Sequence, residues 1–207
     1  MNRFARFASA LLTVLTVAAA IAAPAAAQSI GPITPVNPIS FGHDLMVNGG
    51  FETNGGLPWW LGLSATIDKV PHRGCLSLRL GGLGNGSAFY RMTLPNSLPE
   101  AKLSYWLQVQ SAEPTTSDRA TWRDGDYLEM RVQTPSLDYT HLFYPRDAAL
   151  QRGTWLYEYV WDLRQDAGQT IDISFKAFAN GTNATWFWID DVALLTGTTL
   201  YATVPFC

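Results

Sequence analysis

Two short stretches decide the fold of this 207-residue chain: Asn48-Gly49-Gly50-Phe51-Glu52 near its start and Trp186-Phe187-Trp188-Ile189-Asp190-Asp191-Val192 near its end. Between them, short runs of alternating apolar and polar residues are separated by clusters of Gly, Pro, Asn and Asp, and no helical period of useful length occurs. This pattern predicts an all-β domain built as a two-sheet antiparallel sandwich.

The closing stretch also predicts an irregularity. Phe187 and Ile189 share one parity with Asp191, whereas Val192 and Leu194 share the other. Side chains alternate between the two faces of a strand, so both apolar pairs reach the core only if the chain breaks step at Asp190-Asp191. We therefore expect a β-bulge there that changes the direction of an acidic side chain.

Between these ends, the alternation assigns a core face and an outer face to most strands. It is clearest in residues 76–80, 103–110, 127–133 and 170–179. In residues 155–163 aromatic side chains occupy one parity and aliphatic ones the other, so that strand is either buried on both sides or contains a bulge.

The two end motifs, with intermediate segments in matching order, resemble the jelly-roll carbohydrate-binding modules of the galactose-binding-domain-like group. Within that group, the two end motifs are similar to those of the cellulose- and xylan-binding families 4 and 9. The modules of these families have Gly-Phe-Glu in the first strand and Asp-Asp-Val in the last. The intermediate segments include Leu103-Ser104-Tyr105-Trp106-Leu107 and Gly153-Thr154-Trp155, and the resemblance spans roughly residues 45–195. It implies a jelly-roll sandwich whose role is binding.

The resemblance also implies a structural calcium ion, held where the first and last strands meet. The matching ligands are Glu52 and Asp191, with Asp190 as a further candidate. Calcium takes six to eight oxygen ligands in flexible geometry, which suits carboxylates. The alternative is that these carboxylates only accept hydrogen bonds from backbone amides.

The first residues predict an exported protein. Arg3 and Arg6 precede an apolar segment, and Ala25-Ala26-Ala27 is typical of a cleavage site, so residues 1–27 form a secretory signal peptide of bacterial type. A Pro-rich extended leader follows at 28–40, then the sandwich at 41–195 and a tail at 196–207. We expect the mature protein to be secreted, either extracellular or periplasmic.

Charge and cysteine content limit the partners. Without Arg3 and Arg6, twelve basic side chains face seventeen acidic ones, a formal charge of −5 that disfavours nucleic acid. No later stretch is apolar enough to span a membrane. Two cysteines, Cys75 and Cys207, permit one disulfide in an oxidising compartment; two free or intermolecular thiols are the alternative.

A carbohydrate site needs exposed aromatic rings for stacking and planar polar side chains for hydrogen bonds. Outer-face residues of two strands supply them, and the resemblance implies that these strands are neighbours in one sheet. The predicted ligand residues are Trp106, Gln108, Gln110, Tyr127, Glu129 and Arg131, with Trp122 from the loop at 111–125. Tyr139, His141 and Phe143 extend the same surface. Alternatively, the loop covers Trp106 and Trp122 packs on it.

The sequence thus predicts a secreted, non-catalytic carbohydrate-binding module. One alternative is an adhesion or interaction module that uses the same sandwich without a sugar ligand. A second is a jelly-roll polysaccharide lyase, for which Arg131, His141, Tyr144 and Lys176 supply the residue types. Its signature strings are incomplete here.

Overall fold

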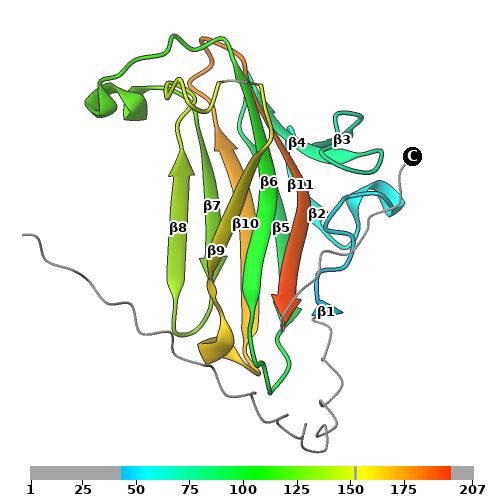
Figure 1. Ribbon diagram of the computed structural model, residues 1–207. Helices are drawn as coiled ribbons and strands as arrows, with labels where there is room; N and C mark the ends of the chain where they lie inside the picture. Colours follow the sequence, from blue (N-terminus) through cyan, green and yellow to red (C-terminus); the bar gives the residue numbers. More distant parts are fainter. Residues whose placement is uncertain (1–42, 152, 197–207) are drawn as a thin grey trace, which may run out of the picture. The chain divides into compact units, whose positions relative to one another are not determined.

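The computed structural model describes residues 43–151 and 153–196, and within them it confirms the predicted all-β sandwich of two antiparallel sheets. The six-stranded sheet faces the viewer in Figure 1. Its order is β3 (Thr66–Asp68), β4 (Ser77–Gly82), β11 (Thr185–Thr196), β6 (Lys102–Ser111) and β9 (Leu156–Asp162), and β1 (His43–Asp44) also pairs with β11.

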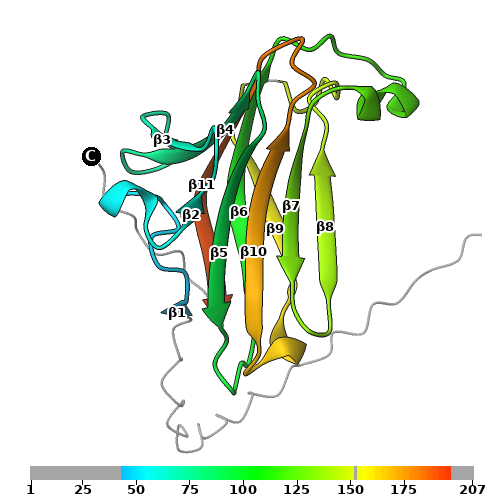
Figure 2. The ribbon, with the colours of Figure 1, turned by 180° about the vertical axis from the view of Figure 1, so that it is seen from behind.

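The five-stranded sheet forms the other layer and faces the viewer in Figure 2. Its order is β2 (Trp60–Leu61), β5 (Gly86–Thr93), β10 (Thr170–Phe178), β7 (Tyr127–Gln133) and β8 (Asp138–Phe143). Three short 3-10 turns complete the described elements: η1 (Asn54–Gly56), η2 (Arg119–Asp124) and η3 (Arg164–Asp166). Among the described residues, no helix is long and apolar enough to cross a membrane.

The core lies between the sheets and follows the predicted alternation. In β6 the buried apolar side chains are Leu103, Tyr105, Leu107 and Val109; in β10 they are Ile171, Ile173, Phe175 and Ala177. Each strand therefore has one face in the core and one outer face. Any ligand site on a sheet must be sought on the two outer faces.

The start and end of the sandwich meet along β11, as the two end motifs predict. β1 pairs with β11, and the Val192 N–H donates to the Gly49 carbonyl at 3.0 Å. The predicted bulge is confirmed: the register of β11 against β6 shifts between Asp190 and Ala193, and Asp191 has φ 47°. Phe187, Ile189, Val192 and Leu194 are all buried as a result.

The ambiguous stretch at 155–163 contains a bulge and is not buried on both sides. The β6–β9 register shifts between Lys102 and Leu103. Tyr157 and Tyr159 lie on the outer face and are 45% and 66% exposed. This places two aromatic side chains beside the outer face of β6.

One topological prediction is wrong: the strands that carry Trp106 and Tyr127 are not neighbours. β6 belongs to the six-stranded sheet and β7 to the five-stranded sheet, so their outer faces lie on opposite sides of the sandwich. The parity of a strand shows which side chains are buried but not which sheet the strand joins. Residues 111–125 carry the chain from one layer to the other, and η2 lies near the ends of β7 and β8 in both views (Figures 1 and 2).

The predicted signal peptide, leader and C-terminal tail beyond Thr196 lie outside the described residues. Cys75 is not a free thiol. Its predicted partner Cys207 lies outside the described residues, so the pairing stays a prediction.

Candidate functional site

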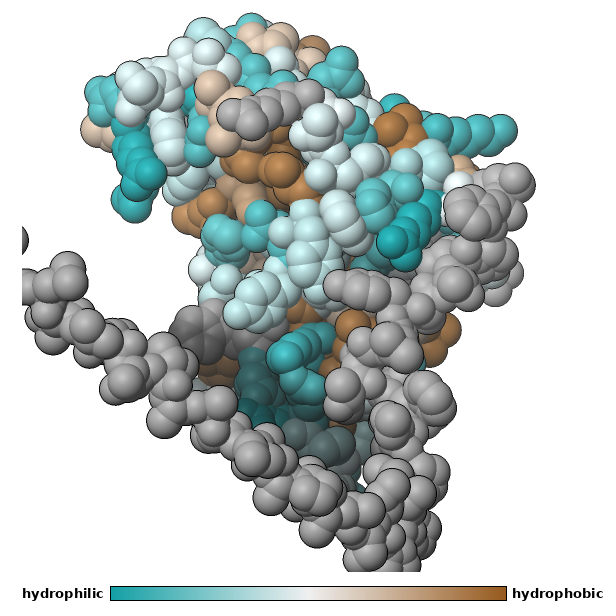
Figure 3. Space-filling view, viewed as in Figure 1, coloured by the Kyte–Doolittle hydropathy of each residue, from teal (hydrophilic) through white to brown (hydrophobic). Residues whose placement is uncertain are grey.

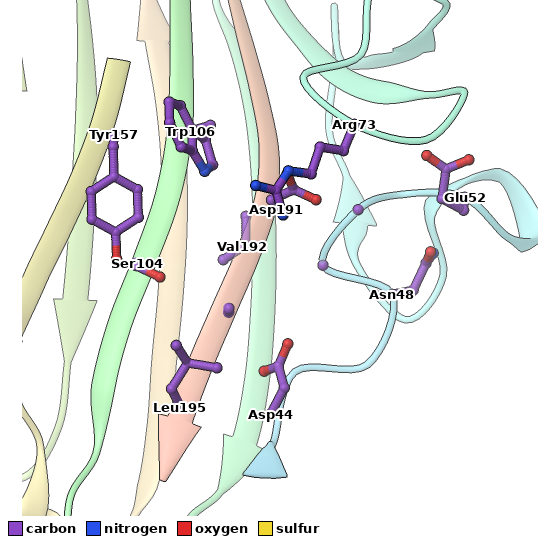
Figure 4. Close-up of a pocket in the computed structure, with 13 residues that line it drawn as sticks. Asp44, Asn48, Glu52, Arg73, Ser104, Trp106, Tyr157, Asp191, Val192 and Leu195 are labelled. Carbon is purple, nitrogen blue, oxygen red and sulfur yellow. The ribbon is translucent and has the colours of Figure 1, made fainter. Parts of the chain in front are cut away.

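A cavity of about 250 Å³ opens on the outer face of the six-stranded sheet. Its floor is formed by small side chains, because Ser104 of β6 and Ala193 of β11 lie directly opposite each other in register. Figure 4 shows Trp106 and Tyr157 on one side of this hollow and Asn48 and Glu52 on the other. From this side, Figure 3 shows pale, weakly polar surface between separate hydrophobic patches.

The aromatic wall comes from two neighbouring strands. Trp106 and Tyr157 are paired in the β6–β9 register, with ring centroids 5.3 Å apart and planes tilted by 56°. His72 stacks on Trp106 with a centroid distance of 3.7 Å and an interplanar angle of 15°. One face of the Trp106 ring is therefore covered by His72, and Trp106 also lines the cavity.

The opposite wall is the segment at 44–52 that lies on the β11 bulge. Glycine is required at its point of closest approach, because a Cβ on Gly49 would lie 1.7 Å from the Val192 carbonyl oxygen. Asp44 fixes the start of this wall by accepting hydrogen bonds from the Met46 and Leu194 amides, each at 2.9 Å. Burial raises the pKa of Asp44 despite these hydrogen bonds.

A carboxylate network anchors the loop at 72–76 to the same bulge. The fully buried Asp190 accepts hydrogen bonds from the amides of His72 (2.7 Å), Arg73 (3.2 Å) and Asp191 (2.7 Å). His72 Nδ1 also lies 2.7 Å from Asp191 Oδ2. Burial, together with the adjacent Asp191 charge, raises the pKa of Asp190 to about 7, although the backbone donors oppose that shift.

The predicted metal ligands do converge, but protein donors already occupy most of their oxygens. Glu52 Oε1 accepts hydrogen bonds from the Cys75 and Leu76 amides at 2.8 and 3.1 Å. Among described partners, only Glu52 Oε2 and Asp191 Oδ1 are left without a hydrogen bond, and calcium takes six to eight oxygens. No group of three or more His, Cys, Asp and Glu side chains in the described ranges is arranged to hold a metal. The backbone-amide alternative is present in the geometry, and calcium stays a prediction.

Of the predicted ligand residues on β6, Trp106 lines the cavity and the other two do not. The Gln108 side chain forms an intramolecular hydrogen bond, in which its Nε2 donates to the Gly153 carbonyl at 2.6 Å. Gln110 is exposed beyond it. Trp122 neither covers Trp106 nor joins this site, because its indole N–H donates to the Thr116 carbonyl at 3.0 Å and its ring faces Tyr144.

The remaining predicted ligand residues lie on the outer face of the five-stranded sheet. Tyr127 stacks on Phe178 with centroids 4.5 Å apart. Glu129 pairs with Lys176 at 3.8 Å, and Arg131 binds Asp138 through two nitrogens. The predicted extension by Tyr139, His141 and Phe143 is wrong, because these residues pair with the buried Val132, Met130 and Leu128 and so lie on the inner face of β8.

Three side chains that line the cavity, those of Tyr157, Arg73 and Asp44, were not predicted from the sequence. Nor was His72, which stacks on Trp106 beside the cavity. Tyr157 belongs to the stretch whose aromatic and aliphatic parities could not be separated. His72 and Arg73 lie in a loop that has no periodic pattern. Only the position of Asp44 just before the opening motif was a usable signal.

Solved structures of other proteins have a similar fold. The chain is similar to a family 61 carbohydrate-binding module solved in complex with β-1,4-galactotriose, with a TM-score of 0.56 and 14% identity over 74% of this chain and 99% of that one. The chain therefore shares the jelly-roll fold of that module.

Other carbohydrate-binding modules give lower TM-scores. A family 28 module specific for non-crystalline cellulose gives a TM-score of 0.45 at 12% identity, covering 78% of this chain and 99% of that one. A family 22 module of Clostridium thermocellum Xyn10B gives 0.43 at 12% identity, covering 80% of this chain and 100% of that one. No family model and no curated protein matches the sequence.

Proposed function

We propose that this jelly roll is an exported, non-catalytic carbohydrate-binding module whose ligand occupies the cavity on the six-stranded sheet. One observation carries the proposal: Trp106 and Tyr157 stand side by side over a hollow whose other wall bears carboxylates and a guanidinium.

The two walls match the two sides of a sugar. The apolar C–H face of a sugar ring packs on an aromatic ring, and its hydroxyls accept or donate hydrogen bonds. Trp106 and Tyr157 offer the apolar surface, while Arg73 and Asp191 offer charged hydrogen-bonding groups across the cavity. Arg73 makes no ion pair with any described residue, so its guanidinium donors are available to a ligand.

The residue types of a lyase do not meet on one surface. Arg131 and Lys176 lie on the outer face of the five-stranded sheet, each bound to an acidic partner. His141 pairs with the buried Met130 and lies on the other face of the same sheet. An acid–base pair must reach one substrate atom together, so this separation supports binding.

Affinity electrophoresis through a panel of soluble polysaccharides tests the proposal. We expect wild-type protein to be retarded by at least one glycan and Trp106→Ala to lose about tenfold or more in affinity. Tyr127→Ala is the matched control, because Tyr127 is also a partly buried outer-face aromatic stacked on one neighbour. It should bind like wild type.

Two results would contradict the proposal. Loss of retardation in Tyr127→Ala with Trp106→Ala unaffected would move the site to the five-stranded sheet. No retardation of folded wild-type protein by any glycan would favour the interaction module without a sugar ligand.

A further inference from the structure

We infer that the cavity takes one uncharged sugar ring at the end of a glycan chain and discriminates against uronates. This inference rests on the proposed function and narrows its ligand. It depends on three properties of the cavity: its size, the closure of its walls and the charge of its lining.

The size suits one ring. The volume of about 250 Å³ is below the roughly 300 to 1,000 Å³ of clefts that bury drug-sized ligands. The hollow exists because Ser104 and Ala193 have small side chains and lie opposite each other. It ends at the larger side chains two residues further along each strand, Trp106 on β6 and Leu195 on β11. A second sugar would have to lie outside it.

The walls close the cavity at two places. His72 already covers one face of Trp106 at 3.7 Å, so a second ring cannot stack there. On the other side, the backbone at Gly49 lies directly on β11, held by the hydrogen bond from Val192 at 3.0 Å. A glycan chain therefore cannot pass beneath the segment at 44–52, and we expect it to enter the cavity by its end.

The charge of the lining favours a neutral ring. Asp44, Glu52 and Asp191 contribute three carboxylates against the single guanidinium of Arg73. A neutral sugar can form charge-assisted hydrogen bonds to all four groups. A uronate would place a fourth carboxylate among three others, and like charges that meet in a partly desolvated site repel.

Calorimetric titration of the full chain tests this. The ligands are methyl glycosides of glucose, galactose and mannose, the tetrasaccharides of the same neutral sugars, and the methyl glycosides of glucuronate, galacturonate and mannuronate. We expect one monosaccharide glycoside to bind, its tetrasaccharide to bind within about threefold of it, and the matching uronide to bind at least tenfold more weakly.

Asp44→Asn tests the charge argument separately. The asparagine oxygen can still accept the Met46 and Leu194 amides, so the wall is retained while one charge is removed. The preference for neutral sugar over uronide should fall severalfold. Asp138→Asn on the five-stranded sheet is the control and should leave the preference unchanged.

The failures of the two proposals are distinguishable. A tetrasaccharide that binds tenfold or more tightly than the monosaccharide, or a uronide that binds equally well, overturns this inference and leaves carbohydrate binding intact. Absence of binding by every sugar in both this set and the polysaccharide panel overturns both.

Discussion

The two outer faces of the sandwich use carboxylates in opposite ways. On the six-stranded sheet, Asp190 is fully buried and accepts three backbone N–H groups. On the five-stranded sheet, Asp172 is partly exposed and binds the Arg91 guanidinium at 2.6 and 2.7 Å.

This contrast between the faces indicates where a ligand can bind. Each charged side chain on the middle of the five-stranded face has a cross-strand partner, so little binding capacity is left there. On the six-stranded face, the carboxylates hold loops in place, and these loops form a wall opposite Trp106 and Tyr157. The five-stranded face is a solvated surface with ion pairs, whereas the six-stranded face carries a cavity with two walls.

The largest expected effect is on stability. Asp190→Ala leaves three amide donors without an acceptor in a buried place, and we expect a loss of about 3 kcal/mol or more in the free energy of unfolding. Asp172→Ala should cost roughly a third of that or less, because exposed ion pairs contribute little. Urea denaturation measures both. Equal losses would remove the distinction between the faces.

The pH dependence of the two faces should have opposite signs. The pKa of Asp190 is raised to about 7, so the folded state holds a proton that the unfolded state releases near pH 4. Its contribution is therefore complete below about pH 4 and is lost as pH rises toward 7, by at most about 1.4 kcal/mol per pH unit.

Asp172 behaves in the reverse way. Its hydrogen bond to Arg91 lowers its pKa, so its contribution is present above pH 4 and is lost in more acidic solution. Unfolding measured from pH 3 to 8 with EDTA present, in wild type, Asp190→Asn and Asp172→Asn, separates the two. An unchanged slope between pH 4 and 7 in Asp190→Asn would contradict the assignment.

A smaller effect is expected at His72, which joins the carboxylate network to the aromatic wall. His72→Ala removes both the stack on Trp106 and the contact to Asp191, and we expect a loss of about 1 to 2 kcal/mol together with weaker sugar binding. His72→Phe retains a ring and should recover most of the binding. Phe178→Ala, which removes the stack on Tyr127, should leave binding unchanged.

The smallest expected effect is that of calcium. Because only Glu52 Oε2 and Asp191 Oδ1 lack a hydrogen bond to a described residue, we expect 1 mM calcium to raise the melting temperature by only a few degrees over EDTA. Glu52→Gln should abolish the response. If wild type shows no response, the backbone amides account for these carboxylates without a metal.

Much of the fold could be predicted because burial leaves a periodic trace in sequence. The alternation in residues 103–110 and 127–133 identified the core side chains. The opposite parities of Phe187 and Val192 required the bulge that the β6–β11 register shows. β5 was missed, since Phe89 on its outer face and Tyr90 on its inner face obscure the alternation.

The site was only partly predictable, for a physical reason. Trp106 was identified from its own strand, but its contact with Tyr157 depends on the register between β6 and β9, which no local pattern encodes. Likewise, parity showed that Tyr127 and Trp106 both point outward but not that they do so on opposite sides. His72 was missed because a loop residue acquires its role from what it touches.

Because β1 pairs with β11, this sandwich is suitable for insertion as a domain into another protein. His43 and Thr196 are register partners, so polypeptide enters and leaves the described sandwich at one point. Splicing that point into a surface turn of a host enzyme would need only short connectors and would little disturb the recipient. Such a chimera would display the Trp106 cavity at a chosen position of the host enzyme. The two ends of the inserted sandwich would remain paired through β1 and β11.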